Sequence, residues 1–227
     1  MHGRETGSQQ TAPTASLLRV IRSPAVNHRV KNSLQLVASL LNMQRSQIKD
    51  PETRRQFEDA AQRIATVAKV HQRLYRDERV DQVALDQLLN ELCSDLEAVG
   101  SGRNIQIECS AQPCTLPTER IIPVAIIVNE LILNAFKHSF PDGRIGTVRL
   151  ECRMEPGFVT VSLFDDGVEL PSDFQIGTIG KGLGMRIVSG LVKQLRATIQ
   201  SKPMDGGKIF ILRVPIQQPG APDARAA

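Results

Sequence analysis

The sequence predicts an α+β protein in which an N-terminal helical hairpin precedes a domain of mixed helices and strands. Of its 227 residues, 41% are hydrophobic and 23% are charged, which is close to the average of folded globular chains and excludes wholesale disorder. The composition changes once, near residues 77–81. Two glycine-free, helix-favouring stretches lie before this point, and strand and helix signals alternate after it.

The first predicted helix spans about residues 16–48. At a helical period its apolar side chains fall on one narrow stripe: Val30, Leu34, Val37, Leu41 and Ile48. Polar side chains cluster on the opposite face: His28, Lys31, Asn32 and Gln35. This arrangement places His28 away from the core.

A second helix is predicted to begin at Asp50-Pro51-Glu52, with Asp50 as the N-cap and Pro51 in the first turn, and to end near Arg76. Its buried face carries residues at the same period: Ala60, Ile64, Val67, Ala68, His71 and Leu74. Two long helices joined by a short turn form an antiparallel hairpin. Because a lone hairpin covers its stripe poorly, we expect a second copy to complete a four-helix bundle, which makes the protein a homodimer.

The remaining chain alternates helices and strands. Helices are expected over residues 84–99, from a cap at Thr118 to about 138, and over 182–196. Strands are expected over residues 104–109, 146–154, 158–164, 197–201 and 208–214, the last four forming two hairpins. A glycine-rich loop over residues 165–181 precedes the last helix. The tails, residues 1–15 and 217–227, are small, polar and Pro-rich.

The composition also excludes several classes of function. With no Trp and one Tyr, the chain can hardly build an aromatic platform for nucleic-acid bases, and a net charge of +4 is too modest to indicate nucleic-acid binding. Polar residues interrupt the longest apolar run, residues 121–133, so no membrane insertion is expected, and no secretory signal is visible. Four cysteines without a C-x-x-C pair predict reduced thiols, no zinc site and a cytoplasmic location.

Two helical segments carry candidate functional residues. An exposed neutral imidazole at His28 is a nucleophile, and Asn32 one turn later can orient a phosphoryl oxygen, although a lone histidine is more often an ordinary surface residue. Glu130, Asn134, Lys137 and His138 share a face of the predicted helix that ends near 138. The amide of Asn134 suits magnesium, and Lys137 with His138 suits phosphate; the alternative is a solvated polar face.

Two loops carry the other candidates. Asp165-Asp166-Gly167 follows an alternating strand, so Asp165 either forms a turn or accepts a hydrogen bond from the exocyclic amine of a nucleotide base. Gly180, Gly182 and Gly184 precede an amphipathic helix, where backbone amides and the helix dipole favour phosphate.

Together these segments closely resemble a histidine kinase of the HRxxN type, with HWE/HisKA-2-like dimerisation helices followed by an α/β-sandwich ATPase domain of the GHKL type. The resemblance covers residues 26–215 in six ordered blocks: HRVKNSLQLVASLLNMQ, AQRIATVAKVHQRLY, NELILNAFKH, DDGVELP, GKGLGMRIVSGLVKQL and GGKIFILRVP. It implies a hairpin domain over residues 16–78 and an ATP-binding domain over residues 79–216.

The resemblance also implies roles for individual residues. His28 would accept the phosphoryl group, supported by Asn32, and Glu130 would organise the nucleotide site. Asn134 would bind Mg²⁺ and Asp165 the adenine amine. The remaining ATP contacts would come from Lys137, His138, Gly167, Gly180, Gly182, Leu183 and Gly184, and residues 169–180 would form the lid.

The chain departs from the family pattern at three points. Ala25 stands where relatives commonly place an acidic residue, three positions before the acceptor, which could weaken proton handling at His28. Glu169 replaces the second glycine of D-x-G-x-G and would store strain if it needed a positive φ. No sensory domain precedes the hairpin in this sequence.

We therefore predict a two-component histidine kinase that autophosphorylates from Mg-ATP and passes the phosphoryl group to an aspartate of a response-regulator receiver domain. The alternative is a phosphotransfer adaptor with the same dimeric fold and no kinase activity, which the irregular Glu169 favours and the nucleotide-site residues oppose. An anti-sigma-type serine kinase fits less well, because it has no use for a hairpin carrying HRVKN.

Overall fold

A computed structural model of the protein describes residues 24–74, 82–170, 174, 176 and 182–216, with the backbone alone for residues 24–28, 73–74 and 98–99. The chain divides into two compact units, residues 1–78 and 79–227.

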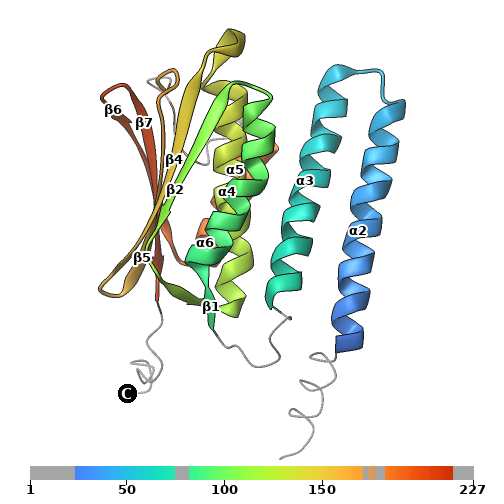
Figure 1. Ribbon diagram of the computed structural model, residues 1–227, viewed down its shortest axis with the longest axis horizontal. Coiled ribbons are helices and arrows are strands. Elements are labelled where there is room, and N and C mark those ends of the chain that lie inside the picture. The colour runs from blue at the N-terminus through green and yellow to red at the C-terminus, as the bar shows by residue number, and fades with distance from the viewer. Residues whose placement is uncertain (1–23, 75–81, 171–173, 175, 177–181, 217–227) are drawn as a thin grey trace, which may run out of the picture. The chain divides into compact units, whose positions relative to one another are not determined.

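The first unit is a hairpin of two long helices, α2 (Pro24–Gln47) and α3 (Pro51–Leu74), which run antiparallel (Figure 1). The carboxylate of Asp50 accepts hydrogen bonds from the Thr53 amide at 2.7 Å and from the Thr53 hydroxyl at 2.6 Å. These bonds satisfy a donor that the first turn of a helix otherwise leaves open. They also hold the pKa of Asp50 below its ordinary value. The predicted cap and hairpin are confirmed.

Helix α2 carries two apolar stripes rather than one. Half-buried apolar side chains recur at intervals of three and four residues: Val30, Leu34, Ala38 and Leu41. Ile48, also expected in this set, is half-buried but follows the helix. Val37, which the sequence analysis placed in this set, is exposed. It directly precedes the half-buried Ala38, and neighbouring residues of a helix point about 100° apart around its axis. A second set of large apolar side chains is exposed on α2, and we call it the outer stripe: Leu36 (61%), Val37 (42%), Leu40 (47%) and Met43 (60%).

The second unit is a two-layer α/β sandwich. Its five-stranded sheet has the order β2 (Ile105–Ala111), β4 (Gly146–Glu155), β5 (Phe158–Asp165), β7 (Gly207–Pro215), β6 (Thr198–Met204). β2 pairs with β4 in parallel, and the other neighbours pair antiparallel. A small antiparallel pair, β1 (Gln82–Ala84) with β3 (Thr115–Pro117), accompanies it.

Helices α4 (Leu85–Ser101), α5 (Thr118–His138) and α6 (Leu183–Gln194) cover one face of this sheet (Figure 1). Alternate residues of the strands point into the core that the helices close: Val148, Leu150 and Cys152 of β4, Val159, Val161 and Leu163 of β5, and Phe210, Leu212 and Val214 of β7. Ion pairs lie along the strands at more exposed side chains, such as Arg149 with Glu108 at 2.9 Å and Arg213 with Glu155 at 3.0 Å. This alternation is that of a sheet with one buried face.

Several boundaries differ from those expected. Thr118 is the first residue of α5 and not its cap; Pro117 precedes the helix and no side chain caps it. β1, β3 and the short 3₁₀ helix η1 (Pro141–Gly143) were not predicted, because each is only three residues long and carries no periodicity.

Helix α5 is long and apolar enough to cross a membrane by length and composition, the one such helix in the described part of the chain. However, 72% of its most apolar window is buried inside the unit. Its apolar side chains are thus those of a core helix packed on a sheet.

All four cysteines are free thiols, three of them buried. The sulfurs of Cys114 and Cys152 lie 3.5 Å apart. The hydrogen bond with Cys114 and burial both raise the pKa of Cys152. The described residues hold no group of three or more His, Cys, Asp or Glu side chains placed to bind a metal ion.

Candidate nucleotide-binding site

The site is built around two charged residues at facing ends of neighbouring strands. Asp165 is the last residue of β5, and Lys208 is its partner in the β5–β7 ladder. Both side chains lie at inward positions of their strands, in step with Leu163 and Phe210. Asp165 is fully buried and the Lys208 side chain is 7% exposed. The alternation of the strands therefore brings a carboxylate and an ammonium together inside the sandwich.

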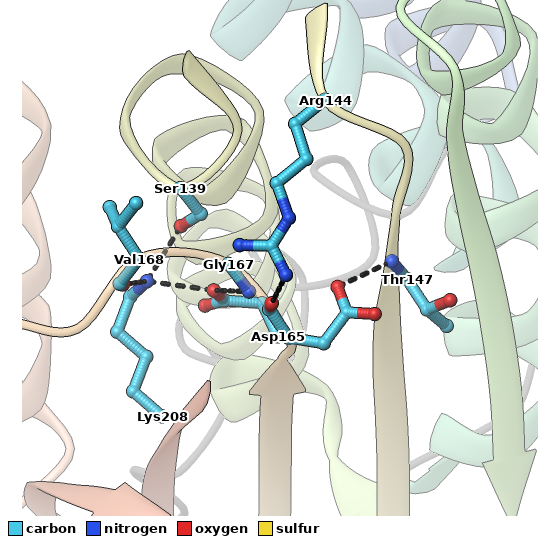
Figure 2. A network of polar contacts seen from close by, with 8 residues as sticks. Ser139, Arg144, Thr147, Asp165, Gly167, Val168 and Lys208 are labelled. Atoms are coloured by element: carbon cyan, nitrogen blue, oxygen red, sulfur yellow. Dashed lines mark hydrogen bonds and ion pairs between the residues drawn. The ribbon is translucent and has the colours of Figure 1, made fainter. Parts of the chain in front are cut away.

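Figure 2 shows the contacts of Lys208. Its ammonium donates to Asp165 Oδ1 at 2.7 Å, to the Ser139 hydroxyl at 2.8 Å and to the Val168 carbonyl at 2.7 Å. These bonds use all three protons of the ammonium. The buried cation is thus both paired and fully hydrogen-bonded, which is the condition under which a buried charge is tolerated.

The two oxygens of the Asp165 carboxylate have different surroundings. Oδ1 accepts from Lys208 and from the Gly167 amide at 3.2 Å. Oδ2 is buried and has no hydrogen-bond partner among the described residues. Because a buried acceptor is costly when left unpaired, Oδ2 is suited to receive a donor from a bound molecule. The exocyclic amine of adenine supplies such a donor, so this carboxylate fits an adenine nucleotide.

The loop after β5 is held against the end of α5. The Val168 amide donates to the Ser139 carbonyl at 2.9 Å, and a Cβ at Gly167 would collide with the Ser139 backbone, so only glycine fits there. On the other side, Asp166 accepts from the Thr147 amide at 2.8 Å, and Arg144 donates to the Asp166 carbonyl at 2.8 Å (Figure 2). The backbone around Asp165 is therefore fixed before any ligand arrives.

Helix α5 brings the next predicted residues to the same unit. Glu130 is 2% exposed and Asn134 is half-buried, so these two do not belong to a solvated face. The side-chain nitrogen of Asn134 donates to the Met185 sulfur of α6 at 3.0 Å, which leaves its amide oxygen available to a hard cation. Lys137 and His138, in the last turn, are exposed.

At the start of α6, Gly182 has a φ of 53° and Leu183 is 57% exposed, whereas Gly184 is buried. The positive φ explains the glycine at 182. Gly180 and most of the expected lid lie outside the described residues. Glu169 is exposed and does not have a positive φ, so the strain considered for it is not present.

The residues predicted to take part in phosphorylation belong to the other unit. His28 lies in α2, with only its backbone described, and Asn32 is exposed one turn later. Each unit carries its own part of the predicted set, Glu130, Asn134, Asp165 and the glycines in one, His28 and Asn32 in the other.

Sequence reasoning missed Lys208 and Ser139. Strand parity could have identified Lys208, because in the segment KIFILRVP the lysine is in step with the inward-facing Phe210, Leu212 and Val214. A charged residue at an inward position of a strand requires a partner of opposite charge, and Asp165 at the end of the preceding strand hairpin supplies one. No sequence signal points to Ser139.

Comparisons with known proteins define the class. Residues 25–99 match the family model described as histidine kinase, and residues 119–218 match that of the histidine kinase-, DNA gyrase B- and HSP90-like ATPases. The chain therefore belongs to the histidine kinase family. The resemblance inferred from the six sequence blocks, and the predicted hairpin followed by a GHKL-type ATPase fold, are confirmed.

Relatives extend this assignment. The sensor histidine kinase PdtaS of Mycobacterium tuberculosis is 30% identical over 200 residues, which cover 86% of this chain and 39% of PdtaS. The blue-light-activated histidine kinase 2 of Erythrobacter litoralis is 27% identical, over 85% of this chain and 56% of its own. The chain thus spans about two fifths of the length of PdtaS and just over half of the length of the blue-light-activated kinase.

Solved structures agree on the fold. The histidine kinase domain of the blue-light-activated kinase EL346 from Erythrobacter litoralis superposes with a TM-score of 0.62 at 22% identity, covering 82% of this chain and 96% of that domain. The longer EL346 structure gives a TM-score of 0.65 at 24% identity, covering 92% of this chain and 62% of that one.

Proposed function

We propose that this protein is a two-component signalling kinase that phosphorylates His28 from Mg-ATP and passes the phosphoryl group to an aspartate of a response-regulator receiver domain. The observation that carries the ATP-dependent step is the buried Asp165 carboxylate, whose Oδ2 has no partner in the part of the chain that the structure describes. Membership of the histidine kinase family and the exposed position of Asn32, one turn after His28, support the rest.

In the first reaction, the bond between the γ-phosphorus and the β,γ-bridging oxygen breaks, a phosphorus–nitrogen bond forms at the His28 imidazole, the imidazole loses its proton and ADP leaves. Asp165 would hold the adenine, and Lys137 and His138 would contact the phosphates from the last turn of α5. Asn134 would hold magnesium through its amide oxygen. The ion, when bound, neutralises charge on the phosphates, so catalysis depends on positioning and electrostatics.

We further propose that the protein acts as a homodimer through the outer stripe of α2. Four large apolar side chains of that stripe are at least 42% exposed on a single copy. A second copy supplies an identical apolar surface about a two-fold axis, and the result is the four-helix bundle expected from the sequence. Asn32 is exposed on a single copy, and a receiver domain would dock against the helix that carries it. A cytoplasmic location fits this assignment.

The adaptor alternative requires an ATP-binding unit that no longer binds nucleotide. The arrangement at Asp165 favours the kinase, because a unit retained only for docking has no need of a buried acceptor without a partner. Glu169, which had favoured the adaptor, imposes no strain on the loop.

Incubation of the purified protein with γ-labelled ATP and magnesium tests the proposal. We expect acid-labile, base-stable label on the parent protein and none on His28→Ala, with unchanged unfolding and ATP affinity. His71→Gln is the matched control, because His71 is partly buried, its pKa is lowered by that burial, and its replacement should leave the label in place. Equal labelling of His28→Ala and parent would reject His28 as the acceptor. The adaptor would be established by a different result: the parent protein neither takes up label from ATP nor binds ATP, but His28 accepts a phosphoryl group from a phosphorylated receiver domain.

A further inference from the structure

Lys208 connects three separate segments of the ATP-binding unit. Its acceptors are Asp165 at the end of β5, Ser139 directly after α5, and Val168 in the loop that leads toward the predicted lid. Each bond is 2.8 Å or shorter, and Ser139 and Asp165 are 1% and 0% exposed. A single buried ammonium therefore fixes where the strand end, the helix end and the loop meet (Figure 2).

The same contact makes the two oxygens of Asp165 unequal. Lys208 and the Gly167 amide both donate to Oδ1, and no donor from residues 24–74, 82–170, 174, 176 and 182–216 reaches Oδ2. Rotation of the carboxylate would exchange the two oxygens and would break a charge-assisted hydrogen bond, which is about twice as strong as a neutral one. The ammonium thus keeps Oδ2 as the oxygen that a ligand meets.

We infer that Lys208 is a positioning residue that sets the base selectivity of the nucleotide site. By holding Asp165 with Oδ2 as the oxygen open to a ligand, it makes the pocket accept a base with an exocyclic amine and reject a base without one. This inference rests on the proposed function, because it concerns the same ATP site. It adds a residue that the sequence analysis did not include among the ATP contacts.

A purely structural role for Lys208 leads to a different expectation. If the lysine only supported the fold, its loss would weaken binding of all nucleotides by the same factor. If it orients Asp165, its loss removes the advantage of a base that carries the amine. The ratio of two affinities therefore distinguishes these roles, whereas either affinity alone does not.

The experiment compares ATP with purine riboside triphosphate, which carries hydrogen in place of the 6-amino group, by calorimetric titration in the presence of magnesium. The parent protein should prefer ATP by roughly ten- to a hundredfold, the usual worth of a hydrogen bond to a charged group. In Lys208→Met, which removes the charge and all three hydrogen bonds, the preference should fall to within about threefold.

Two further variants keep the test decisive. Lys208→Gln retains one amide donor without the charge. It takes the place of Lys208→Met should the methionine variant fail to fold. Its preference for ATP over purine riboside triphosphate should fall at least about threefold below that of the parent. Lys202→Met removes an exposed lysine from the neighbouring strand β6 and should match the parent in both affinities.

The outcomes separate this inference from the function on which it rests. A folded Lys208 variant that keeps the parental preference, even with weaker binding of both nucleotides, would overturn the inference and leave the kinase proposal standing. A parent protein that binds neither nucleotide would overturn both.

Discussion

The two units of the chain depart from the ordinary distribution of polar and apolar residues in different ways. In the ATP-binding unit the large core side chains are fully buried, among them Leu89, Ile132 and Leu150, and two charged residues, Asp165 and Lys208, are buried with them. The exposed large apolar side chains of this unit lie apart, each on a different segment: Ile145, Met154, Val168, Leu183 and Met204. In the hairpin the exceptions are apolar side chains outside, in the outer stripe of α2.

This difference indicates what each unit still requires. The outer stripe lacks a covering surface, which a second hairpin would supply. The buried Asp165 receives no donor at Oδ2 from the described residues, and a nucleotide would supply one. Both departures, the apolar side chains gathered on one helix and the charged pair inside the sandwich, lie where the proposed function operates.

The largest effect is expected at the outer stripe. Leu40→Glu should convert the dimer to a monomer, because burying a leucine contributes about 1.5–3 kcal/mol and a two-fold axis counts each change twice. Leu41, considered from the sequence, is less suitable, because it is half-buried within a single copy. The molar mass in solution at micromolar concentration provides the measurement. Asn42→Glu, an exposed change on another side of α2, should remain dimeric. If the parent protein is itself a monomer, the proposed dimer through the outer stripe is wrong.

The buried charges of the other unit come next. Asp165→Asn should lower the free energy of unfolding by about 3–5 kcal/mol, because it leaves the Lys208 ammonium without its counter-charge. Asp165→Asn combined with Lys208→Met removes both charges, so denaturant unfolding should recover most of that loss. ATP affinity should nevertheless stay about 1.5–3 kcal/mol weaker in the double variant, because the ionised acceptor is gone. A double variant as unstable as the single one would show that the ion pair is not what stabilises this region.

A smaller effect is expected at the cap of α3. The hydrogen bonds from Thr53 lower the pKa of Asp50, so the cap stabilises the folded state above the ordinary pKa of an aspartate, 3.8, and this contribution disappears as the pH falls through the lowered value. Asp50→Ala should reduce the melting temperature of the hairpin near neutral pH. The difference between variant and parent should vanish in acid. A difference that persists unchanged in acid would exclude the charged cap as its cause.

The smallest effect is expected at Glu169. Because this residue is exposed and its φ is not positive, Glu169→Gly relieves no strain and should change the free energy of unfolding by less than about 1 kcal/mol. Autophosphorylation should proceed at the parental rate. A several-fold acceleration would instead indicate that the glutamate charge opposes phosphate.

Much of the fold could be predicted because its elements are long and regular. Helices α2 to α6 and strands β4 and β5 carry a clear period and recognisable turns, and the Asp50 cap lies in sequence next to the helix that it begins. The parallel pairing of β2 with β4 could not be predicted in this way, because it joins segments separated by α5 and no turn sequence specifies the partner.

The candidate site shows the same boundary between local and non-local information. Asp165 and Gly182 stand in short motifs, so they were found. The contact of Lys208 with Ser139 joins residues 69 positions apart in the sequence and depends on the register of β5 with β7. The choice of α2 face also failed at Val37, because a helical period identifies an apolar surface but not which of two apolar stripes meets the neighbouring helix.

The ladders of the sheet also differ in how far apart their strands lie along the chain, and this has a consequence for assembly. The β4–β5 and β6–β7 pairs close over Pro156-Gly157 and Asp205-Gly206, whereas β2 meets β4 only across residues 112–145. Closing a long loop is entropically costly, so we expect the two hairpins to form early and β2 to join late. Because α5 lies within that loop, we expect β2 to pair with β4 only after α5, the helix that carries Glu130 and Asn134, has packed on the sheet. Slow hydrogen exchange of the β2 amides would then report, during refolding, that the nucleotide site has formed.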